Sequence, residues 1–505
     1  MPHDQATWQL WIDRPGALVS PFLFGHFAEH LGRCIYEGLW VGPESPIPNQ
    51  DGLRTDVLAA LRDLPVPVLR WPGGCFADDY HWEDGIGPRE RRPRRTNLWW
   101  YGEEPNHFGT DEFLALCRAI GAEPYICLNV GSGSPTEARN WLEYCNGSGQ
   151  THYARLRAQH GHPEPYGVRY WGVGNENWGC GGHFTPEEYA AAYRRFATYL
   201  KPFTRTTRSR IELIACGHTT PDWNQRFLAA LGVERNPRLL DLIDHLSIHR
   251  YFRGPHDRDF TAADYYWLLA STLQLETDLR RTRDVLSYDG GQKRLGIVVD
   301  EWGTWYDQAR AENGLEQVNT MQDAVVAAGT LNLFVRWADW VTMANLAQTV
   351  NVLQCVVQTA GPAMWLTPTY HAVHLLAAHR GQRVLPADLE TPELTVSGPA
   401  GTSARLPLVD GAASRSADGR TLVLTLVNRH LEEAIECRIS LRGEGRIDGG
   451  LHQQLTADDI RAANSAADPE RVRPTRAPFP AAGTTVAVTL PPHSVTALQL
   501  TLVSP

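Results

Sequence analysis

The sequence predicts an α/β fold, with a (β/α)8 TIM barrel followed by a C-terminal antiparallel β-sandwich of the jelly-roll kind. Between about residues 60 and 380, short apolar runs alternate with longer segments of helical spacing, which is typical of βα units and a parallel sheet. So many units favour a barrel over a doubly wound sheet, and no GxGxxG follows the first strand. After residue 380, apolar and polar residues alternate with a period of two, which predicts antiparallel strands.

The barrel elements can be placed in chain order. We expect strands at 65–74, 124–133, 166–177, 211–217, 242–252, 294–303 and 338–347, because each is a short apolar run. The clearest helices are at 110–121, 134–146 and 185–201, with a further one at about 322–335. The helix at 110–121 begins at a Thr and stops at a Gly, and the helix at 185–201 has a Pro in its first turn.

The remaining chain predicts the second domain. Strands are expected at 421–430, 434–443 and 484–502, with turn residues between them. The segment TWQLWID near the N-terminus predicts one more strand, which we expect to join the C-terminal sheet. The predicted organisation is therefore a strand within residues 1–15 that belongs to the sandwich, a catalytic barrel over 16–380, and the sandwich over 381–505. Such a division fits a length of 505 residues, which exceeds one compact domain.

Composition excludes several classes of protein. A net charge of −10 argues against a nucleic-acid partner, and we expect the basic cluster RERRPRR (89–95) to be solvated or ion-paired. No apolar run is long enough for a bilayer, and the N-terminus lacks the basic and apolar segments of a signal peptide, so we expect no membrane partner. The nine cysteines are scattered without a CxxC, which predicts free, mostly buried thiols and a cytoplasmic location.

The stretch HFAEH (26–30) has the H-x-x-E-H spacing of a class of zinc peptidases. That chemistry needs a helix, so that both imidazoles reach one metal. Here the stretch lies between SPFLFG and LGRCIYEG, which are loop-like, and no third ligand with metal spacing is evident. We expect His26 and His30 to brace a loop at a strand end and Glu29 to reach a substrate.

Two glutamates close apolar strands in the predicted barrel. Glu176 follows the strand at 168–174, and Glu301 follows the strand in which Leu295, Ile297 and Val299 are expected on the face that ends in that carboxylate. Catalytic groups of a TIM barrel sit at the carboxyl ends of its strands, and a pair of carboxylates there is the equipment of glycoside hydrolysis. On the strand at 245–251, alternation brings His249 and Tyr251 to one face, from which either could orient Glu301.

The motifs that contain these residues resemble glycoside hydrolase family 51, the α-L-arabinofuranosidases. The resemblance covers residues 20–380 and rests on GNEN (174–177), VDEWG (299–303), FGHFAEHLGRCIYEGLW (24–40), RWPGGCFADDYHWEDGIGP (70–88), NHFGTDEF (106–113), LAQTVNVLQ (346–354) and LTPTYHAVHL (366–375). It implies that Glu176 is the acid/base and Glu301 the nucleophile of a retaining exo-acting enzyme. The substrate-binding residues that it implies are Glu29, Arg70, Cys75, Trp100, Asn175, Tyr251, Trp305 and Gln348, and we add His249 from its place on the strand.

The resemblance also implies the partners. Family members act on arabinan or arabinoxylan oligosaccharides, need no metal or other cofactor, and are commonly hexamers, so we expect a homo-oligomer. Two features depart from the family. Cys75 stands where many members have Asn, and a thiol is a weaker hydrogen-bond partner. The loop between Glu301 and the helix at about 322–335 is short, which bears on the choice between polymer and oligosaccharide.

Three alternatives remain open at this point. An endo-β-1,4-glucanase or xylanase of the same clan would use the same pair of glutamates, but in an open cleft. A carbohydrate-binding or sensor protein could be built on an inactive barrel, although both carboxylates are present. A zinc peptidase would be inhibited by a chelator.

Overall fold

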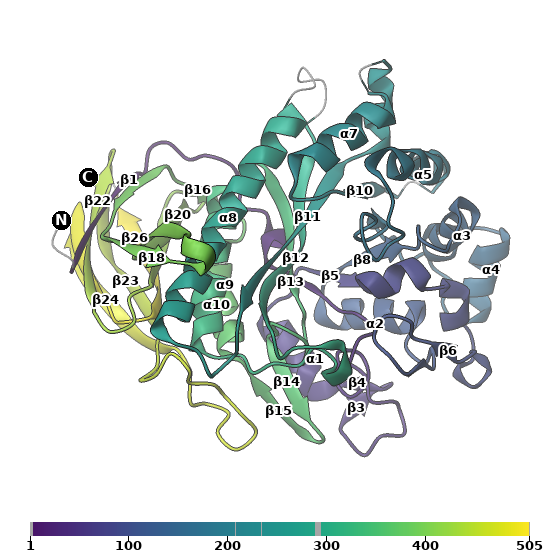
Figure 1. Cartoon of the computed structure of the whole chain (residues 1–505), viewed down its shortest axis with the longest axis horizontal. Helices are drawn as coiled ribbons and strands as arrows, with labels where there is room; N and C mark the ends of the chain where they lie inside the picture. Colours follow the sequence, from purple (N-terminus) through teal and green to yellow (C-terminus); the bar gives the residue numbers. More distant parts are fainter. Residues whose placement is uncertain (1–3, 208, 234, 288–293, 504–505) are drawn as a thin grey trace.

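The computed structural model describes residues 4–207, 209–233, 235–287 and 294–503. Eight parallel strands of this described part close into a barrel with the order β10–β11–β12–β13–β2–β5–β8–β9, so the predicted TIM barrel is confirmed (Figure 1). In chain order they are β2 (Gly25–Phe27), β5 (Val68–Trp71), β8 (Glu123–Leu128), β9 (Tyr170–Val173), β10 (Glu212–Cys216), β11 (His245–Gly254), β12 (Gly296–Tyr306) and β13 (Val341–Ala347).

Helices follow these strands and surround the barrel. They are α1 (Thr55–Asp63), α2 (Thr110–Ile120), α3 (Pro135–Asn146), α4 (His152–Gln159), α5 (Pro186–Leu200), α6 (Phe203–Thr206), α7 (Pro221–Leu231), α8 (Ala262–Ser287), α9 (Met321–Arg336) and α10 (Pro368–Leu376). Local sequence explains where two of the predicted helices begin or end. Thr185 and Glu188 form a capping box at the start of α5, and Gly121 ends α2 with a φ of 75°. None of the helices in the described ranges combines the length and the apolar character needed to cross a membrane.

A register shift in β12 decides which of its side chains enter the barrel. Val298 packs with Val68, Tyr125 and other residues of neighbouring strands in the barrel interior, whereas Ile297 and Val299 pack in the large cluster shared with the helices. The pairing of β12 with β11 then skips Asp300, so that Ile248 faces Val299 but His249 faces Glu301. The prediction that Ile297 and Val299 share a face with Glu301 is therefore wrong, because the extra residue moves Glu301 to the inner face.

Two sheets form the C-terminal part. One has the order β17 (Ala387–Glu390), β1 (Gln5–Trp11), β22 (Ile435–Arg442) and β25 (Thr485–Leu490). The other runs β16 (Arg383–Val384), β20 (Val409–Arg415), β21 (Thr421–Asn428), β26 (Ser494–Val503), β23 (Arg446–Leu455) and β24 (Thr475–Gly483). Their pairs are antiparallel except β1 with β22, which is parallel. Trp8 and Leu10 of β1 are buried in the core between the sheets.

The N-terminal strand thus lies in the sheet formed by the end of the chain, and both termini lie on that side of the molecule (Figure 1). Helix α9 joins the barrel to the sandwich: Asn332 donates to Asp410 Oδ2 at 3.0 Å and accepts from Thr425 Oγ1 at 2.6 Å. We propose residues 1–15 and 381–505 as one domain and residues 16–380 as the other.

Short elements complete the fold. The hairpins are β3 (Asn49–Gln50) with β4 (Leu53–Arg54), β6 (Arg95–Thr96) with β7 (Glu103–Glu104), β14 (Val357–Ala360) with β15 (Ala363–Leu366), and β18 (Glu393–Ser397) with β19 (Ser403–Pro407). The 3-10 helices are η1 (Pro21–Phe24), η2 (Cys75–Asp79), η3 (Trp82–Gly85), η4 (Arg89–Arg91), η5 (Pro237–Leu242), η6 (Ala311–Asn313), η7 (Ala377–His379) and η8 (Pro399–Gly401). The basic cluster at 89–95 is ion-paired, as expected: Arg89 and Arg92 contact Glu112, and Arg95 contacts Asp84.

Candidate active site

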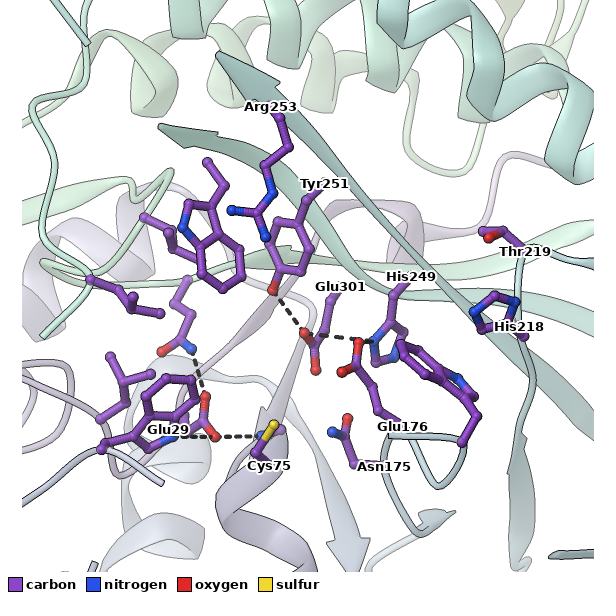
Figure 2. Close-up of a pocket in the computed structure, with 18 residues that line it drawn as sticks. Glu29, Cys75, Asn175, Glu176, His218, Thr219, His249, Tyr251, Arg253 and Glu301 are labelled. Carbon is purple, nitrogen blue, oxygen red and sulfur yellow. Dashed lines mark hydrogen bonds and ion pairs between the residues drawn. The ribbon is translucent and has the colours of Figure 1, made fainter. Parts of the chain in front are cut away.

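A cavity of about 330 Å³ opens at the carboxyl ends of the barrel strands. Figure 2 shows its walls, with Glu176 and Glu301 pointing toward each other. All the predicted site residues line it except Arg70, which lies below its floor: Glu29, Cys75, Trp100, Asn175, Glu176, His249, Tyr251, Glu301, Trp305 and Gln348. The fold therefore brings together residues that are spread over more than 300 positions of the sequence.

Glu301 is a buried carboxylate held by two donors. Arg70 Nη1 donates to its Oε1 at 2.8 Å, and the Tyr251 hydroxyl donates to its Oε2 at 2.7 Å. Burial alone would raise the pKa of Glu301, but the charges of His249 and Arg70 and the two hydrogen bonds lower the pKa below its usual value. Glu301 is accordingly ionised at neutral pH and has a fixed orientation.

Glu176 follows β9 and approaches Glu301 from the other side of the cavity (Figure 2). Its Oε1 lies 2.9 Å from Nδ1 of His249, and the same nitrogen lies 3.6 Å from Oε2 of Glu301. An oxygen of each carboxylate lies within 4.8 Å of the other. Two carboxylates from different strand ends thus face each other across a short gap, with a histidine beside both.

His249 lies beside both carboxylates. Burial alone would lower the pKa of His249, but the charge of Glu301 and the hydrogen bond and charge of Glu176 raise it above its usual value. The two carboxylates therefore favour the charged form of this imidazole.

Glu29 forms the opposite wall and is also fully buried. Its Oε1 accepts from the Gly74 N–H at 2.9 Å and from Trp100 Nε1 at 3.0 Å, and its Oε2 accepts from Gln348 Nε2 at 2.9 Å. Burial and the charge of Glu301 raise the pKa of Glu29 to about 7. A Cβ at Gly74 would lie 2.9 Å from Glu301 Oε1, so any larger residue there would push against this carboxylate.

The other predicted residues complete the walls. Asn175 accepts from Arg70 Nη2 at 2.6 Å, so this one guanidinium positions both Asn175 and Glu301. Trp305 packs edge-on against the Tyr251 ring, with the ring centroids 5.1 Å apart. The loop after β12 adds Leu315 to the lining of the cavity.

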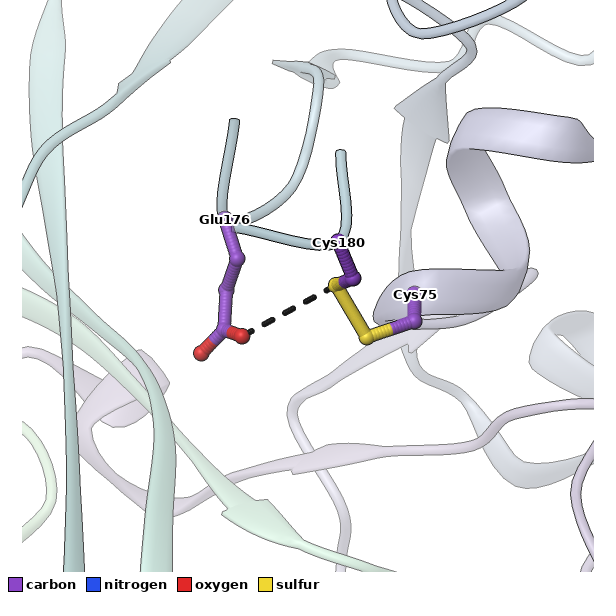
Figure 3. A group of neighbouring side chains, drawn as sticks. All are labelled: Cys75, Glu176 and Cys180. Atoms are coloured by element: carbon purple, nitrogen blue, oxygen red, sulfur yellow. Dashed lines mark hydrogen bonds between the residues drawn. A yellow bond between two sulfur atoms is a disulfide. The ribbon is translucent and has the colours of Figure 1, made fainter. Parts of the chain in front are cut away.

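The prediction of free thiols is wrong for Cys75, which forms a disulfide with Cys180 (Figure 3). The two residues are 105 positions apart, in the loops that follow β5 and β9, and they meet only because these loops meet at the barrel mouth. The other cysteines are free and buried, as expected. Cys75 therefore offers no thiol, and the hydrogen-bond donors beside it are the backbone N–H groups of Gly74 and Phe76, which bind Glu29.

Comparison with known proteins identifies the family. Residues 60–266 match the model of the α-L-arabinofuranosidase 1 domain, and residues 300–494 match that of the α-L-arabinofuranosidase C-terminal domain. The chain is 40% identical to the intracellular exo-α-L-arabinofuranosidase of Bacteroides ovatus, over 98% of this chain and 95% of that protein. The chain belongs to the α-L-arabinofuranosidases of glycoside hydrolase family 51.

Solved structures agree with this assignment. The family 51 arabinofuranosidase of Xanthomonas axonopodis pv. citri is 37% identical, with a TM-score of 0.91 over 98% of this chain and 100% of that one. An arabinose complex of the Thermotoga maritima α-L-arabinofuranosidase is also 37% identical, with a TM-score of 0.88 over the same shares. The glucanase or xylanase alternative is less supported, because both the family models and these relatives are arabinofuranosidases.

The HFAEH stretch has no zinc geometry in this arabinofuranosidase. Residues 25–27 form strand β2, and the rest of the stretch is a loop. His30 Nδ1 pairs with Glu104 at 2.8 Å, and its Nε2 accepts from Trp71 Nε1 at 3.1 Å. Burial and the charge of Arg380 lower the pKa of His26 to about 3. Within the described ranges, the clusters of side chains with metal-ligand spacing do not include His26 or His30.

Several residues of the arabinofuranosidase cavity were not predicted from the sequence. Trp178, His218, Thr219 and Arg253 line it, and the Arg253 guanidinium lies 3.8 Å above the Trp305 ring. Arg253 continues the alternation of His249 and Tyr251 along β11, so the pattern that found those two could have found it. His218 and Thr219 follow β10, and no acidic residue or glycine-rich turn in that loop singles them out.

Proposed function

We propose that this arabinofuranosidase is a retaining, exo-acting enzyme that removes terminal α-L-arabinofuranosyl residues from arabinan or arabinoxylan oligosaccharides. The observation that carries the proposal is the pair formed by Glu176 and Glu301, whose closest oxygens lie within 4.8 Å. Retaining enzymes hold their carboxyl groups about 5–5.5 Å apart, whereas inverting enzymes need about 6.5–9.5 Å to admit a water molecule. The small, walled cavity suits the end of a chain better than an internal position.

In the proposed mechanism, the Glu301 carboxylate attacks the anomeric carbon while Glu176 protonates the departing glycosidic oxygen. The C–O bond to the leaving group breaks as the bond to Glu301 forms, which inverts the anomeric centre and leaves Glu176 ionised. A water molecule then gives its proton to Glu176 and attacks the same carbon, and the Glu301 oxygen departs. Two inversions give net retention, and both carboxyl groups return to their starting states.

The roles of the other residues follow from their contacts. Arg70 and Tyr251 orient the Glu301 carboxylate, and Arg70 also orients Asn175 toward the sugar. Glu29, Gln348 and Trp100 form a connected polar group that would bind sugar hydroxyls. Trp305 closes the cavity as an apolar wall. At the position of Cys75 we assign any polar contact to the backbone, because its sulfur is in the disulfide.

The stereochemistry of the product tests the proposal. We expect proton NMR of 4-nitrophenyl α-L-arabinofuranoside hydrolysis to show the α-anomer first, with the β-anomer appearing only by mutarotation. We also expect turnover of arabino-oligosaccharides and no cleavage of unsubstituted xylan or cellulose. Release of the β-anomer first would exclude double displacement, and internal cleavage of xylan would favour the endo-acting alternative.

Replacing Tyr251 by Phe should move the acid limb of the pH profile. The Tyr251 hydroxyl stabilises the ionised form of Glu301, so its loss raises the pKa of Glu301, and activity is lost at a higher pH as the pH falls. A hydrogen bond to a charged group contributes about 1.5–3 kcal/mol, which corresponds to a shift of roughly one to two pH units. The measurement is kcat/KM against pH.

The matched control is Tyr166→Phe, which removes a phenol hydrogen bond from the remote carboxylate of Asp111. This variant should keep the acid limb of the wild type. An unchanged acid limb in Tyr251→Phe would contradict the assignment of Glu301 as the group that titrates there.

We also infer that the protein is a homo-oligomer, a hexamer by its resemblance to the family, and that it is cytoplasmic and acts on imported oligosaccharides. The name of the Bacteroides ovatus relative, which calls that protein intracellular, supports the location. The cysteines do not support a cytoplasmic location, because Cys75 and Cys180 are paired in a disulfide. Light scattering after gel filtration tests the oligomer, and fractionation of the source cells tests the location.

A further inference from the structure

The loop that carries Glu176 has a backbone that needs support. It runs from the end of β9 to the start of α5, and Glu176 itself has a φ of 41°. This left-handed conformation is uncommon for a residue with a side chain, and it persists only where the surrounding structure holds it. The contacts that hold this loop therefore decide where the Glu176 carboxylate points.

One such contact is the carboxylate of Asp78, which is buried under the loop. It accepts from the Asn175 N–H at 2.8 Å, next to Glu176, and from the N–H groups of Val130 and Gly131 at 2.7 and 2.8 Å. Asn177, on the other side of Glu176 in the chain, has its Nδ2 3.4 Å from Asp78 Oδ2. Asp78 thus fastens the loop after β9 to the loop after β8.

The packing around Asp78 is tight. A Cβ at position 181 would lie 2.5 Å from Asp78 Oδ2 and 2.0 Å from the Asn175 carbonyl oxygen, so only glycine fits there. The loop is therefore folded directly onto this carboxylate, with no room for another side chain between them.

The second contact is the disulfide. Cys75 lies on η2, the same short helix as Asp78, and its bond to Cys180 fastens the middle of the loop, four residues after Glu176 (Figure 3). The Cys180 sulfur lies 3.9 Å from Oε2 of Glu176. A disulfide sulfur has no proton to donate, so this is a packing contact, which limits where the carboxylate can move.

We propose that η2 positions the acid/base residue, with Asp78 as a positioning residue and the Cys75–Cys180 disulfide as a second, redox-sensitive fastening. This inference rests on the proposed role of Glu176 as acid/base. A dithiol reductant would transfer two electrons and two protons to the two sulfurs, giving the thiols of Cys75 and Cys180, while the reductant becomes a disulfide. If either the hydrogen bonds of Asp78 or the Cys75–Cys180 disulfide is lost, the Glu176 carboxyl group can move away from the leaving oxygen.

The experiment compares two arabinofuranosides, one with the good leaving group 4-nitrophenol and one with a poor leaving group such as methanol. A good leaving group departs without protonation. Displacement of the Glu176 acid should therefore slow only the substrate with the poor leaving group. In Asp78→Asn, an NH2 group replaces one of the two carboxylate oxygens. This group is a donor and cannot accept from the backbone N–H groups that face it. We expect kcat/KM to fall by about 100-fold for the methyl glycoside and by a few-fold for the nitrophenyl one.

The matched control is Asp111→Asn, which removes a buried carboxylate that accepts hydrogen bonds from Tyr144 and Tyr166, away from the cavity. It should lower thermal stability and keep the ratio of the two substrates. Equal losses on both substrates in Asp78→Asn, or no loss, would overturn the positioning role, because a merely structural defect does not select the poor leaving group.

A separate experiment tests the disulfide. This experiment also tests the role of η2 if Asp78→Asn does not fold. Wild type treated with dithiothreitol and the Cys180→Ser variant should both lose activity selectively on the methyl glycoside, and Cys180→Ser should be insensitive to the reductant. Full activity of the reduced wild type, with both thiols verified by alkylation and mass spectrometry, would overturn the second fastening and leave Asp78 as the positioning residue. If Glu176→Ala itself shows no preference for the good leaving group, the proposed function fails instead.

Discussion

Replacing Glu301 by Ala is expected to give the largest loss of activity, about 10⁴- to 10⁶-fold in kcat on 4-nitrophenyl α-L-arabinofuranoside. Without this carboxylate no covalent intermediate can form, and no other carboxylate reaches the same face of the sugar in the proposed mechanism. Added azide should restore part of the activity by entering the space of the lost side chain. Azide then attacks the substrate directly in one displacement, so the product should be the inverted β-arabinofuranosyl azide.

Stability has to be separated from chemistry in this variant. Removing Glu301 also takes from the buried Arg70 the carboxylate that it contacts at 2.8 Å, and an uncompensated buried charge destabilises a protein. Glu301→Gln keeps the size of the side chain and should be equally inactive. An inactive Gln variant with a folded far-UV circular dichroism spectrum assigns the loss to the nucleophile, whereas wild-type activity in either variant would contradict the mechanism.

Replacing Glu176 by Ala is expected to lower kcat/KM by about 10²- to 10⁴-fold on substrates with poor leaving groups. The loss on the nitrophenyl substrate should be smaller, because nitrophenolate leaves without a proton. The arabinosyl-enzyme then accumulates, because no base activates water. Added azide should raise kcat on the nitrophenyl substrate and give the retained α-arabinofuranosyl azide.

The two azide products distinguish the roles of the glutamates. An inverted azide from Glu301→Ala and a retained azide from Glu176→Ala are both required by the proposed assignment. The reverse pattern, read from the NMR coupling at the anomeric carbon, would exchange the roles. No azide product from Glu176→Ala would mean that this residue is not the base of the second step.

The parts of the fold that local sequence determines could be predicted. Helix α5 begins at a capping box formed by residues three positions apart, and β12 opens with an apolar run that is long enough to recognise. The pairing of a strand with a distant partner carries no such local signal. The register shift in β12 depends on how β11 pairs with it, and it changed the faces expected for Ile297 and Val299.

The same distinction applies to the cavity. His249 and Tyr251 were predicted by alternation on one strand, and the glutamates by their position at strand ends. The Cys75–Cys180 disulfide could not be predicted, because 105 residues separate its partners and only the closed barrel brings them together. The hydrogen bonds of Asp78 to residues 130, 131 and 175 could not be predicted either, because they join three separate loops that only the closed barrel brings together.

The placement of β1 has a consequence for synthesis on the ribosome. This strand precedes the whole barrel in the chain, but its partners β17 and β22 begin only at Ala387 and Ile435, so β1 waits at least while residues 12–386 are translated. At about 5–20 residues per second, that interval is roughly 20–75 s. During this time Trp8 and Leu10, which the finished core buries, have no sheet to join, and the nascent chain presents an apolar strand to chaperones.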